Sequence, residues 1–287
     1  MNNIITDNTV TALKKYISDS LALIYDERER YTIVTELFRH FLNWNRSDLV
    51  LNQHERVTES MMLQFHFALK KLKAEEPLQY VLGQTHFHGH DFKVNPAVLI
   101  PRPETEELVR AILVKENRIA PAILDIGTGS GCIAISLKLG KPQARVVALD
   151  ISEKALETAG ENARVLNAEI QLLQMNILQE IPEEKFDIIV SNPPYIPNGD
   201  RHEMRSQVLK HEPWVALFVE DADPILFYRR IITISKKMLN PGGSLWFEIH
   251  EKMKQELMTL LQEQNIHKAQ FMQDMQGKDR MLHIVFE

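Results

Sequence analysis

Three glycines alternate in the segment DIGTGSGC, where Gly127, Gly129 and Gly131 follow the apolar run AILDI. Glycine has no Cβ, so such a loop can turn tightly after a strand and let a ligand approach the backbone. From about residue 121, strand-like and helix-like segments alternate along the chain, and AQFMQDM and RMLHIVFE close it as two strands. This alternation predicts an α/β fold, a mostly parallel doubly wound sheet with an antiparallel hairpin at one edge.

The N-terminal part has a different pattern, with no Gly and with no Pro before Pro77. VTALKKYISDSL, ERYTIVTELFRHFLNW and ESMMLQFHFALKKLK repeat apolar residues at helical spacing, and SDLVLNQHERV predicts a short helix capped by Ser47 or Asp48. We therefore expect three regions. These are a helical bundle over 1–80 that recognises a substrate protein or carries the second domain, a β-hairpin linker over 81–100, and the sheet domain over 101–287.

Composition excludes some classes of protein. The 287 residues carry a formal net charge of −6, which disfavours a chain built mainly to bind nucleic-acid backbones. The single cysteine, Cys132, cannot form an internal disulfide, which suits a reducing cytosol. MNNIITDNTV lacks the features of a signal peptide, and no apolar run reaches the ~20 residues of a membrane helix. We expect a cytoplasmic protein with no membrane and no direct nucleic-acid partner.

An acidic residue, Asp150, follows the glycine loop at the distance expected for the end of the next strand. The strand ARVVALDI ends at Asp150, and adjacent parallel strands end at the same edge of a sheet, where a carboxylate can accept both ribose hydroxyls of an adenosine. The dinucleotide spacing is G-x-G-x-x-G, whereas here the third glycine comes one position early and Cys132 takes its place. The alternating form after Asp125 resembles the S-adenosylmethionine loop of class I methyltransferases. This resemblance implies the cofactor-binding set Gly127, Thr128, Gly129, Ser130, Gly131, Asp150, Asn176, Ile177 and Asn192.

Alternatives remain open for several of these positions. The glycine loop is also compatible with a plain strand-to-helix turn that binds no ligand. Asp125 reaches either the cofactor ammonium or only its own loop. Asn176 and Ile177 follow the third strand, where this superfamily often binds the adenine amino group and packs on the ring. The superfamily often has Asp at the first place, so Asn176 is a departure, and an ordinary strand-ending Asn is the alternative.

The fourth strand runs into SNPPY at the same edge. An amide nitrogen is a poor nucleophile while its lone pair is delocalised, and two acceptors can hold the two hydrogens of its NH₂ group. The Asn192 side-chain oxygen supplies one acceptor and the carbonyl of Pro193 the other, rigidly aimed because proline fixes φ. Tyr195 can lie over the planar group. This arrangement favours N-methylation by positioning; the alternative is a cis-proline or rigid turn without chemistry.

Longer stretches carry a family resemblance across nearly the whole chain. YVLGQTHFHGHDFKVNPAVLIPRPETEELV, DIGTGSG, FDIIVSNPPYI, HEPWVALF and GGSLWFEI resemble the HemK/PrmC family of peptide chain release factor glutamine N5-methyltransferases. The combination of LIPRPETE with NPPYI is specific, since DNA adenine methyltransferases share only the second. The resemblance implies a helical bundle, a hairpin linker and a seven-stranded class I methyltransferase domain. It also implies methyl transfer from S-adenosyl-L-methionine to the Gly-Gly-Gln glutamine of class 1 release factors.

The same resemblance assigns roles to individual residues. It implies that the catalytic and substrate-binding segment is Asn192, Pro193, Pro194 and Tyr195, with Asn192 also near the cofactor. It implies that Arg102, Glu104 and Thr105 of PRPETE cap the active site on the cofactor side; a salt bridge with a nearby glutamate is the alternative for Arg102. Glu212 orders the loop after the catalytic segment or is a solvated turn acid.

Two departures affect the expected loop shapes but not the catalytic segment. His250 and Glu251 follow FEI where the family usually has His-Gly or Gly, and VEDADPIL replaces a Gly-rich segment. HFHGH at 86–90 is expected to alternate along one strand face, and we expect no metal site there because a solvated hairpin face is commoner.

Other functions stay open as alternatives. A ribosomal-protein glutamine methyltransferase would use identical chemistry, and a nucleic-acid adenine N-methyltransferase would need a basic recognition region. A nicotinamide-dependent dehydrogenase conflicts with the early third glycine and with NPPY. A non-catalytic binding module would not need Asn192.

Overall fold

The computed structural model describes residues 7–286, which fall into two compact units. The smaller unit extends to Gly83 and also contains Ser206–His211. The larger unit comprises Gln84–Arg205 and the chain from Glu212 onward. Within the described residues, no helix is both long enough and apolar enough to cross a membrane.

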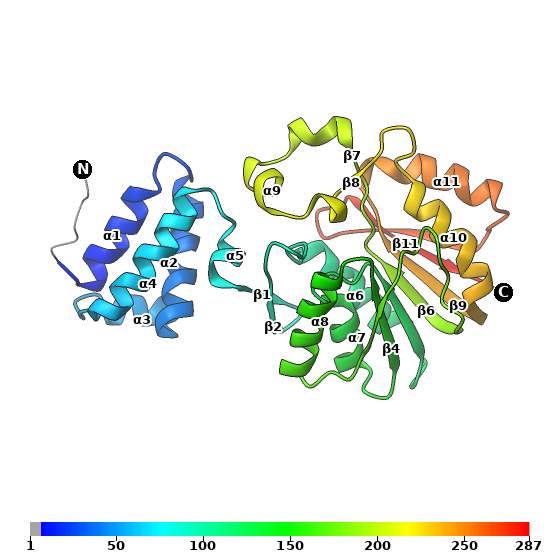
Figure 1. The fold of residues 1–287 in the computed structure, drawn as a ribbon, viewed down its shortest axis with the longest axis horizontal. Helices are drawn as coiled ribbons and strands as arrows, with labels where there is room; N and C mark the ends of the chain where they lie inside the picture. Colours follow the sequence, from blue (N-terminus) through cyan, green and yellow to red (C-terminus); the bar gives the residue numbers. More distant parts are fainter. Residues whose placement is uncertain (1–6, 287) are drawn as a thin grey trace. The chain divides into compact units, whose positions relative to one another are not determined.

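The smaller unit is helical, as the apolar spacing predicts, and α1, α2 and α4 lie side by side in it (Figure 1). Its apolar positions form one buried cluster around Leu37, Phe38 and Phe65. The third helix begins one residue before Ser47, and its N-cap is Asn45, whose Oδ1 accepts from the N–H groups of Ser47 and Asp48. The expected cap at Ser47 or Asp48 is wrong, because the Asn45 side chain already binds those N–H groups. The helices are α1 (Val10–Ser20), α2 (Glu27–Leu42), α3 (Arg46–Leu51), α4 (Glu59–Lys73), α5 (Leu78–Leu82) and α9 (Ser206–His211).

Helix α9 belongs to this unit although it follows the NPPY segment in the sequence. Glu75 accepts a hydrogen bond from Ser206 at 2.8 Å and forms an ion pair with Lys210. Gln207 donates to the Tyr25 hydroxyl at 2.8 Å. These polar contacts fix the short helix on the bundle.

The larger unit has a seven-stranded sheet among its described residues, in the order β10-β11-β9-β6-β3-β4-β5 (Figure 1). Neighbours from β9 to β5 run parallel, and β11 pairs antiparallel with both β9 and β10. The expected doubly wound sheet with an antiparallel edge hairpin is therefore confirmed. The strands of this sheet are β3 (Ala122–Ile126), β4 (Arg145–Asp150), β5 (Gln171–Gln174), β6 (Phe186–Ser191), β9 (Leu239–Glu248), β10 (Ala269–Gln273) and β11 (Asp279–Val285).

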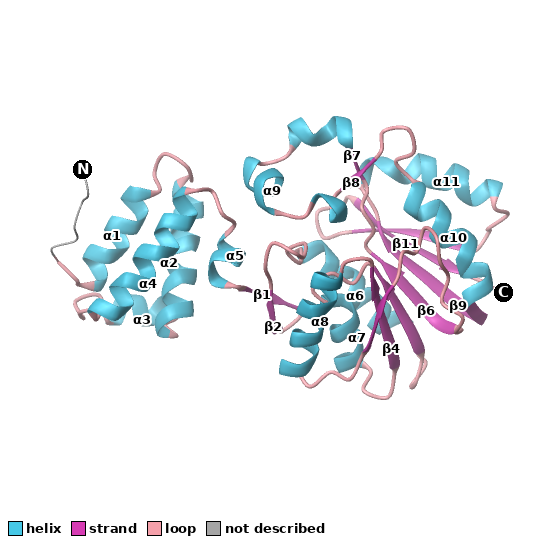
Figure 2. Cartoon of the chain, in the orientation of Figure 1, coloured by secondary structure: helices cyan, strands magenta, loops and turns pink. Residues whose placement is uncertain are grey.

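Helices cover both faces of the sheet (Figure 2). One apolar cluster joins it to α10 and α11 through residues such as Tyr228 and Leu257, and the other joins it to α6 and α7 through residues such as Val109 and Ile135. Cys132 is buried in the second cluster, as expected of a small apolar side chain. The helices are α6 (Pro103–Lys115), α7 (Cys132–Gly140), α8 (Glu153–Val165), α10 (Leu226–Met238) and α11 (Lys254–Glu263), with 3₁₀ turns η1 (Asn198–Glu203), η2 (Trp214–Ala216) and η3 (Glu251–Met253).

Two short strand pairs complete the unit. The expected hairpin is β1 (Gln84–Phe87) with β2 (His90–Lys93), and it groups with the larger unit because Asn162 of α8 bonds both the N–H and the carbonyl of Lys93. The HFHGH run crosses the turn of this hairpin, so the expectation of a single strand face at 86–90 is wrong. The second pair is β7 (Ile196–Pro197) with β8 (Phe218–Val219).

Strand β9 is irregular near its start. It begins at Leu239, before the Pro-Gly-Gly segment, and its pairing with β6 shifts register between Phe186 and Ile188. Gly242 has φ of +72° there. A glycine at positive φ lets a strand carry an irregularity of this kind, which the sequence pattern alone reads as a break.

Candidate active site

A cavity of about 260 Å³ lies where the loops after β3, β4, β5 and β6 meet. The chain passes from β3 to β4 and β5 on one side and resumes with β6 on the other side of β3. Ligands of open α/β sheets bind at such a switch of strand order, outside the carboxyl ends. Of the predicted site residues, the lining contains Gly127, Gly129, Asp150, Asn176, Ile177, Asn192, Pro193 and Pro194. Among the described residues, those predicted but outside the lining are Thr128, Ser130, Gly131 and Tyr195.

The three alternating glycines differ in what surrounds them. Gly127 and Gly129 have φ of +78° and +55°, and a Cβ on either would meet no atom within 4 Å. A Cβ on Gly131 would lie 2.9 Å from Ile135 and 3.1 Å from Ala159. The first two glycines therefore leave open space for a ligand beside the backbone. The third allows the start of α7 to pack closely on α8.

Asp150 ends β4 and joins this loop to the next helix. Its Oδ2 accepts from the Gly129 N–H at 2.9 Å, and its Oδ1 accepts from the Ser152 N–H at 2.9 Å. Ser152 itself caps α8 by accepting from the Ala155 N–H. Burial raises the pKa of Asp150, while its N–H donors act in the opposite direction. Each carboxylate oxygen keeps a further lone pair, so the group can also accept ribose hydroxyls.

Asp125 lies beneath the glycine loop and is fully buried. Its Oδ2 accepts from the Thr128 hydroxyl at 2.6 Å and from the Ala134 N–H at 3.2 Å. Its Oδ1 has no partner among residues 7–286. Burial raises the pKa of this carboxyl to about 7. The loop-stabilising bond is present, and the second oxygen keeps its capacity to accept from a bound ligand.

The surroundings of Asn176 are compatible with both roles expected for it, a contact to the adenine amino group and an ordinary strand-ending turn. It lines the cavity, and its Oδ1 accepts from the Leu178 N–H at 3.0 Å. This local turn uses one lone pair of the amide oxygen and leaves a second acceptor position. Ile177 is buried beside it and also lines the cavity.

The segment after β6 presents its side chains to two different surroundings. Asn192, Pro193 and Pro194 line the cavity together with Ile126 and Leu149. The Asn192 Nδ2 donates to the Thr105 hydroxyl at 3.4 Å, and no residue in the described chain donates to its Oδ1. Tyr195 does not line the cavity, and the centroid of its ring lies 5.6 Å from that of the His250 ring.

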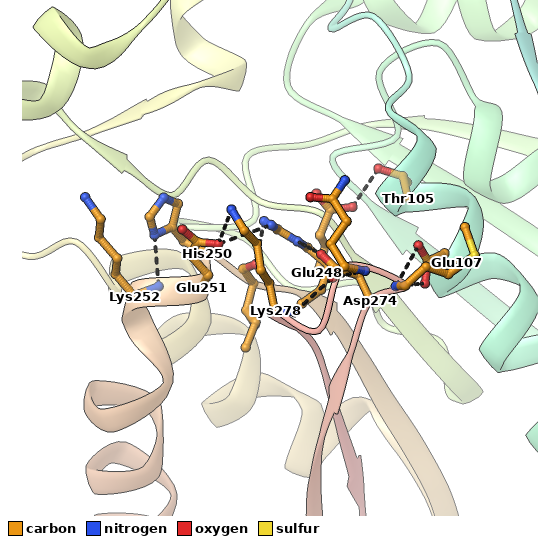
Figure 3. A network of polar contacts seen from close by, with 12 residues as sticks. Thr105, Glu107, Glu248, His250, Glu251, Lys252, Asp274 and Lys278 are labelled. Atoms are coloured by element: carbon orange, nitrogen blue, oxygen red, sulfur yellow. Dashed lines mark hydrogen bonds and ion pairs between the residues drawn. The ribbon is translucent and has the colours of Figure 1, made fainter.

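The buried carboxylate of Glu248 connects these groups, and Figure 3 shows its contact with Thr105. Glu248, the last residue of β9, accepts from the Thr105 hydroxyl at 2.6 Å and from the Tyr195 hydroxyl at 3.4 Å. Its backbone carbonyl accepts from the hydroxyl of Tyr228 on α10. Burial raises the pKa of Glu248, and burial also raises the pKa of Tyr195. The acid, the hydroxyls and the Asn192 amide thus form one hydrogen-bonded group next to the cavity.

The PRP segment before α6 is tied to the loop that follows the NPPY motif. Glu212 is buried, accepts from the Ile100 N–H at 3.1 Å, and pairs with Arg102 at 2.5 Å. The ion pair expected as the alternative for Arg102 is present, but its partner is distant in sequence. Glu212 orders its loop and is not a solvated turn acid. The acids Glu104 and Glu106 stand in the first turn of α6, where the helix dipole favours them.

Reasoning from the sequence missed several residues of this site. Glu248 lies in the stretch GGSLWFEI and was not predicted as a site residue, although an acid that ends a strand at the ligand edge is a usable signal. Val98, Val215 and Phe227 line the cavity and carry no polar chemistry that would single them out. Of the residues that the structure describes, no group of three or more His, Cys, Asp or Glu is arranged to hold a metal ion.

Comparisons with known proteins agree with this geometry. The family models "Methyltransferase small domain" and "PrmC N-terminal domain" match residues 105–212 and 12–83. A T. thermophilus 16S rRNA N2 methyltransferase, solved with AdoMet and guanosine, shares the fold with a TM-score of 0.53 at 18% identity, over 71% of this chain and 50% of that one.

Two curated relatives extend the likeness to almost the full length. The release factor glutamine methyltransferase of Flavobacterium psychrophilum is 44% identical, over 93% of this chain and 95% of the relative. That of Bacteroides thetaiotaomicron is 40% identical, over 96% of this chain and 98% of the relative. The chain belongs to the release factor glutamine methyltransferase family.

Proposed function

We propose that this chain transfers a methyl group from S-adenosyl-L-methionine to the side-chain amide nitrogen of the glutamine in the Gly-Gly-Gln motif of class 1 peptide chain release factors, and so modulates translation termination. The observation that carries the proposal is that one cavity is lined both by the glycine loop with Asp150 and by Asn192, Pro193 and Pro194. The names of the curated relatives supply the class of substrate.

The residues present fit the cofactor. Open space beside Gly127 and Gly129 admits a ligand against the backbone, and Asp150 stands at the end of the adjacent strand, where it accepts ribose hydroxyls. Ile177 packs on the adenine ring, and the second lone pair of Asn176 accepts from the adenine amino group. The unpartnered Oδ1 of Asp125 is available to the ammonium of the cofactor. Thr128, Ser130 and Gly131 hold the loop rather than line it.

Asn192 and Pro193 hold the substrate amide. The Asn192 Oδ1 accepts one N–H of the glutamine NH₂ group, and the Pro193 carbonyl accepts the other. Two acceptors fix the plane of the amide and aim its nitrogen, which is where most of the rate enhancement arises in a reaction between two bound groups. Bound S-adenosylmethionine supplies an electrophilic methyl on its sulfonium, so an N–C bond replaces the S–C bond, the sulfur keeps the electron pair, and the nitrogen releases one proton.

Pro194 and Tyr195 complete the slot. Pro194 lines the cavity as a rigid wall, and the Tyr195 hydroxyl contact with Glu248 holds the end of the segment. The Tyr195 ring bounds the planar amide from the side of His250.

We also infer the partner and the site of action. The helical unit recognises the release factor, which is supported by its exposed apolar side chains, for example Tyr31, Leu63 and Phe67. The net charge of −6 disfavours direct contact with nucleic acid. We place the protein in the cytoplasm, because translation termination takes place there, and we assign it no membrane partner.

The test is methylation of a purified class 1 release factor with S-adenosylmethionine, followed by mass spectrometry of the peptide that contains Gly-Gly-Gln. We expect a gain of one methyl on the glutamine amide. A release factor in which that glutamine is replaced by Glu is the control and should remain unmodified. Absence of the methyl group on the intact motif would refute the proposal.

Parallel reactions separate the alternatives of substrate. Ribosomal protein and adenine-containing DNA or RNA are incubated under the same conditions with the same cofactor. Faster transfer to a ribosomal-protein glutamine would reassign the substrate and keep the chemistry. Transfer to an adenine would overturn both the substrate and the role given to the helical unit.

A further inference from the structure

Three elements meet in a hydrogen-bond chain beside the cavity. Glu248 at the end of β9 accepts from the hydroxyl of Thr105 in the first turn of α6, at 2.6 Å. The same hydroxyl oxygen accepts from the Nδ2 of Asn192, at 3.4 Å. Glu248 and Thr105 are 2% and 3% exposed, so water does not take the place of either partner.

The donors and acceptors of this chain leave one arrangement. An ionised carboxylate only accepts, and a threonine hydroxyl has a single hydrogen. If Thr105 gives that hydrogen to Glu248, it can only accept from Asn192. The amide of Asn192 must then turn its NH₂ group to Thr105 and its oxygen away from it. An acid that does not line the cavity therefore determines which end of the amide is free for a ligand.

Protonation or removal of the acid would abolish this constraint. A neutral group at 248 can donate to Thr105, and the Thr105 hydrogen then becomes available to the oxygen of Asn192. The amide could rotate and turn its NH₂ group away from Thr105. The NH₂ group of Asn192 would then face the NH₂ group of the substrate amide. Two donors repel each other where a donor and an acceptor would pair, so the slot would lose its preference for a primary amide.

Glu248 is suited to this role by its surroundings. Among the described residues, Glu248 forms no ion pair; Arg280, whose charge lowers the pKa of Glu248, pairs with Asp274 at 3.2 Å instead. Its two oxygens each meet a neutral hydroxyl, Thr105 on one and Tyr195 on the other. Both ends of the Asn192–Tyr195 segment are therefore linked to the same buried acid: Asn192 through the Thr105 hydroxyl, and Tyr195 directly.

We propose that Glu248 is a positioning residue that, through Thr105, locks the Asn192 amide with its oxygen free for the NH₂ group of the substrate. This proposal rests on the proposed function, and it makes the slot selective for a primary amide over a carboxylate. Glu248 itself does not touch the substrate.

The test compares Thr105→Val, which removes the hydroxyl at nearly constant volume, with Thr105→Ser, which keeps it. We expect Thr105→Val to lower kcat on the release factor about 10- to 100-fold, since slight misplacement of a reacting group has effects of this size. Thr105→Ser should recover kcat to within about threefold of the unchanged protein. In both variants the Kd for S-adenosylmethionine should stay within about twofold. Equal loss of activity in the Ser and Val variants would overturn the proposal.

A double-mutant cycle separates positioning from a general structural effect. Because Thr105 acts through Asn192, Thr105→Val should cost nothing further when it is added to Asn192→Ala. A loss of kcat that multiplies with that of Asn192→Ala would refute the proposed coupling. If Thr105→Val does not fold, Glu248→Gln replaces it in the cycle with the same expectation.

A competitor peptide tests selectivity. A peptide with Glu in place of the Gly-Gly-Gln glutamine should inhibit the unchanged protein poorly. The preference for Gln over Glu should fall about tenfold in Glu248→Gln, and an unchanged preference would count against the proposal.

A readout without turnover distinguishes failure of this inference from failure of the proposed function. In protein labelled with ¹⁵N-Asn, the side-chain NH₂ signal of Asn192, assigned by its absence in Asn192→Ala, should be protected from hydrogen exchange. Protection should be lost in Thr105→Val and kept in Thr105→Ser. If no release factor is methylated but this pattern holds, only the proposed substrate fails. If the signal is unprotected in the unchanged protein, the positioning chain itself is refuted.

Discussion

Helix α6 meets strand β9 through a buried glutamate near each of its ends. At the N-terminal end, Thr105 of α6 bonds Glu248 of β9. At the C-terminal end, Glu116 caps α6 and accepts from the Ser244 hydroxyl and, at 3.2 Å, from the Trp246 indole N–H of β9. The same two elements thus pair twice through an acid and a hydroxyl, once beside the cavity and once at the far end of the helix.

The two acids differ in how their charge is compensated. Glu116 pairs with Arg118 at 2.9 Å in addition to its two neutral donors. Glu248 has hydroxyl donors only, and its burial raises its pKa. A buried acid without a cation is costly for folding, and such groups concentrate at functional sites. The difference suggests that Glu116 serves stability and that Glu248 serves the geometry of the slot.

The largest effect is expected beside the cavity, at the amide that Glu248 is proposed to orient. Asn192→Ala removes one of the two acceptors proposed for the substrate amide, and loss of a single aimed hydrogen-bonding group in an active site lowers kcat about 10²- to 10³-fold. The measurement is the rate of methyl transfer to the release factor at saturating cofactor.

Binding and stability serve as its controls. The Kd for S-adenosylmethionine should change less than about fivefold, and the midpoint of thermal unfolding should move by only a few degrees. A variant that retains turnover would show that Asn192 does not hold the amide.

The next largest effect is expected at the C-terminal end of α6, where Glu116 bonds β9. Glu116→Ala leaves the Ser244 hydroxyl buried without its acceptor, at a cost of about 1 to 3 kcal/mol, whereas the Trp246 N–H keeps the Ser244 Oγ as an acceptor at 3.0 Å. We expect the free energy of unfolding to fall by about 1 to 3 kcal/mol and the thermal midpoint by about 3 to 10 °C. The kcat of the folded fraction should remain within twofold. A large loss of kcat without a loss of stability would reverse the assignment of the two acids.

The sequence was sufficient for the parts of the fold that rest on local patterning. Alternating strand and helix periods predicted the sheet and its edge hairpin, and apolar residues at helical spacing predicted the N-terminal helices and their common core. The sequence did not predict features that depend on a competing cap residue or on an irregular strand pair. The cap at Asn45 competes with two adjacent candidates, and the start of β9 depends on a glycine at positive φ within a strand pair.

The site was predictable to a similar degree, and for the same reason. Gly127, Gly129, Asp150 and Asn192 carry signals in their type and spacing, and they line one cavity. The partner of Arg102 is 110 positions away and that of Thr105 is 143 positions away, so no spacing rule identifies Glu212 or Glu248. Such contacts arise only when the sheet brings its strand ends to one edge.

A third prediction concerns pH and is smaller than the first two. The carboxylate form of Glu248 fixes the amide, and its pKa is raised above the ordinary value of 4.5, so kcat should fall as the pH drops below that raised pKa, by about 10- to 100-fold in total, the loss expected when the positioning chain is broken. In Glu248→Gln this dependence should disappear. Its plateau should be lower than that of the unchanged protein.

Other titratable groups in the neighbourhood define how this profile is measured. Glu104, Tyr195, Tyr228 and Arg280 face Glu248 from the surrounding elements, and both tyrosines have raised pKa values, so they stay neutral in this range. Burial raises the pKa of Asp125 to about 7, so the profile is measured at saturating cofactor and compared with that of Glu248→Gln. An acid limb that persists unchanged in Glu248→Gln would assign it to another group.

The smallest expected effect is a shift of the pH profile caused by the charge of Glu104, a neighbour of Glu248. Glu104 raises the pKa of Glu248 by like-charge repulsion, so Glu104→Gln should move the acid limb of the profile to lower pH, by less than about one unit because water screens the exposed part of Glu104. Glu106→Gln is the matched control, since it removes an acid from the same first turn of α6 and changes the helix dipole interaction equally. Only the first substitution should shift the limb. A shift of equal size in both would trace the profile to the helix terminus and not to the acid that orients Asn192.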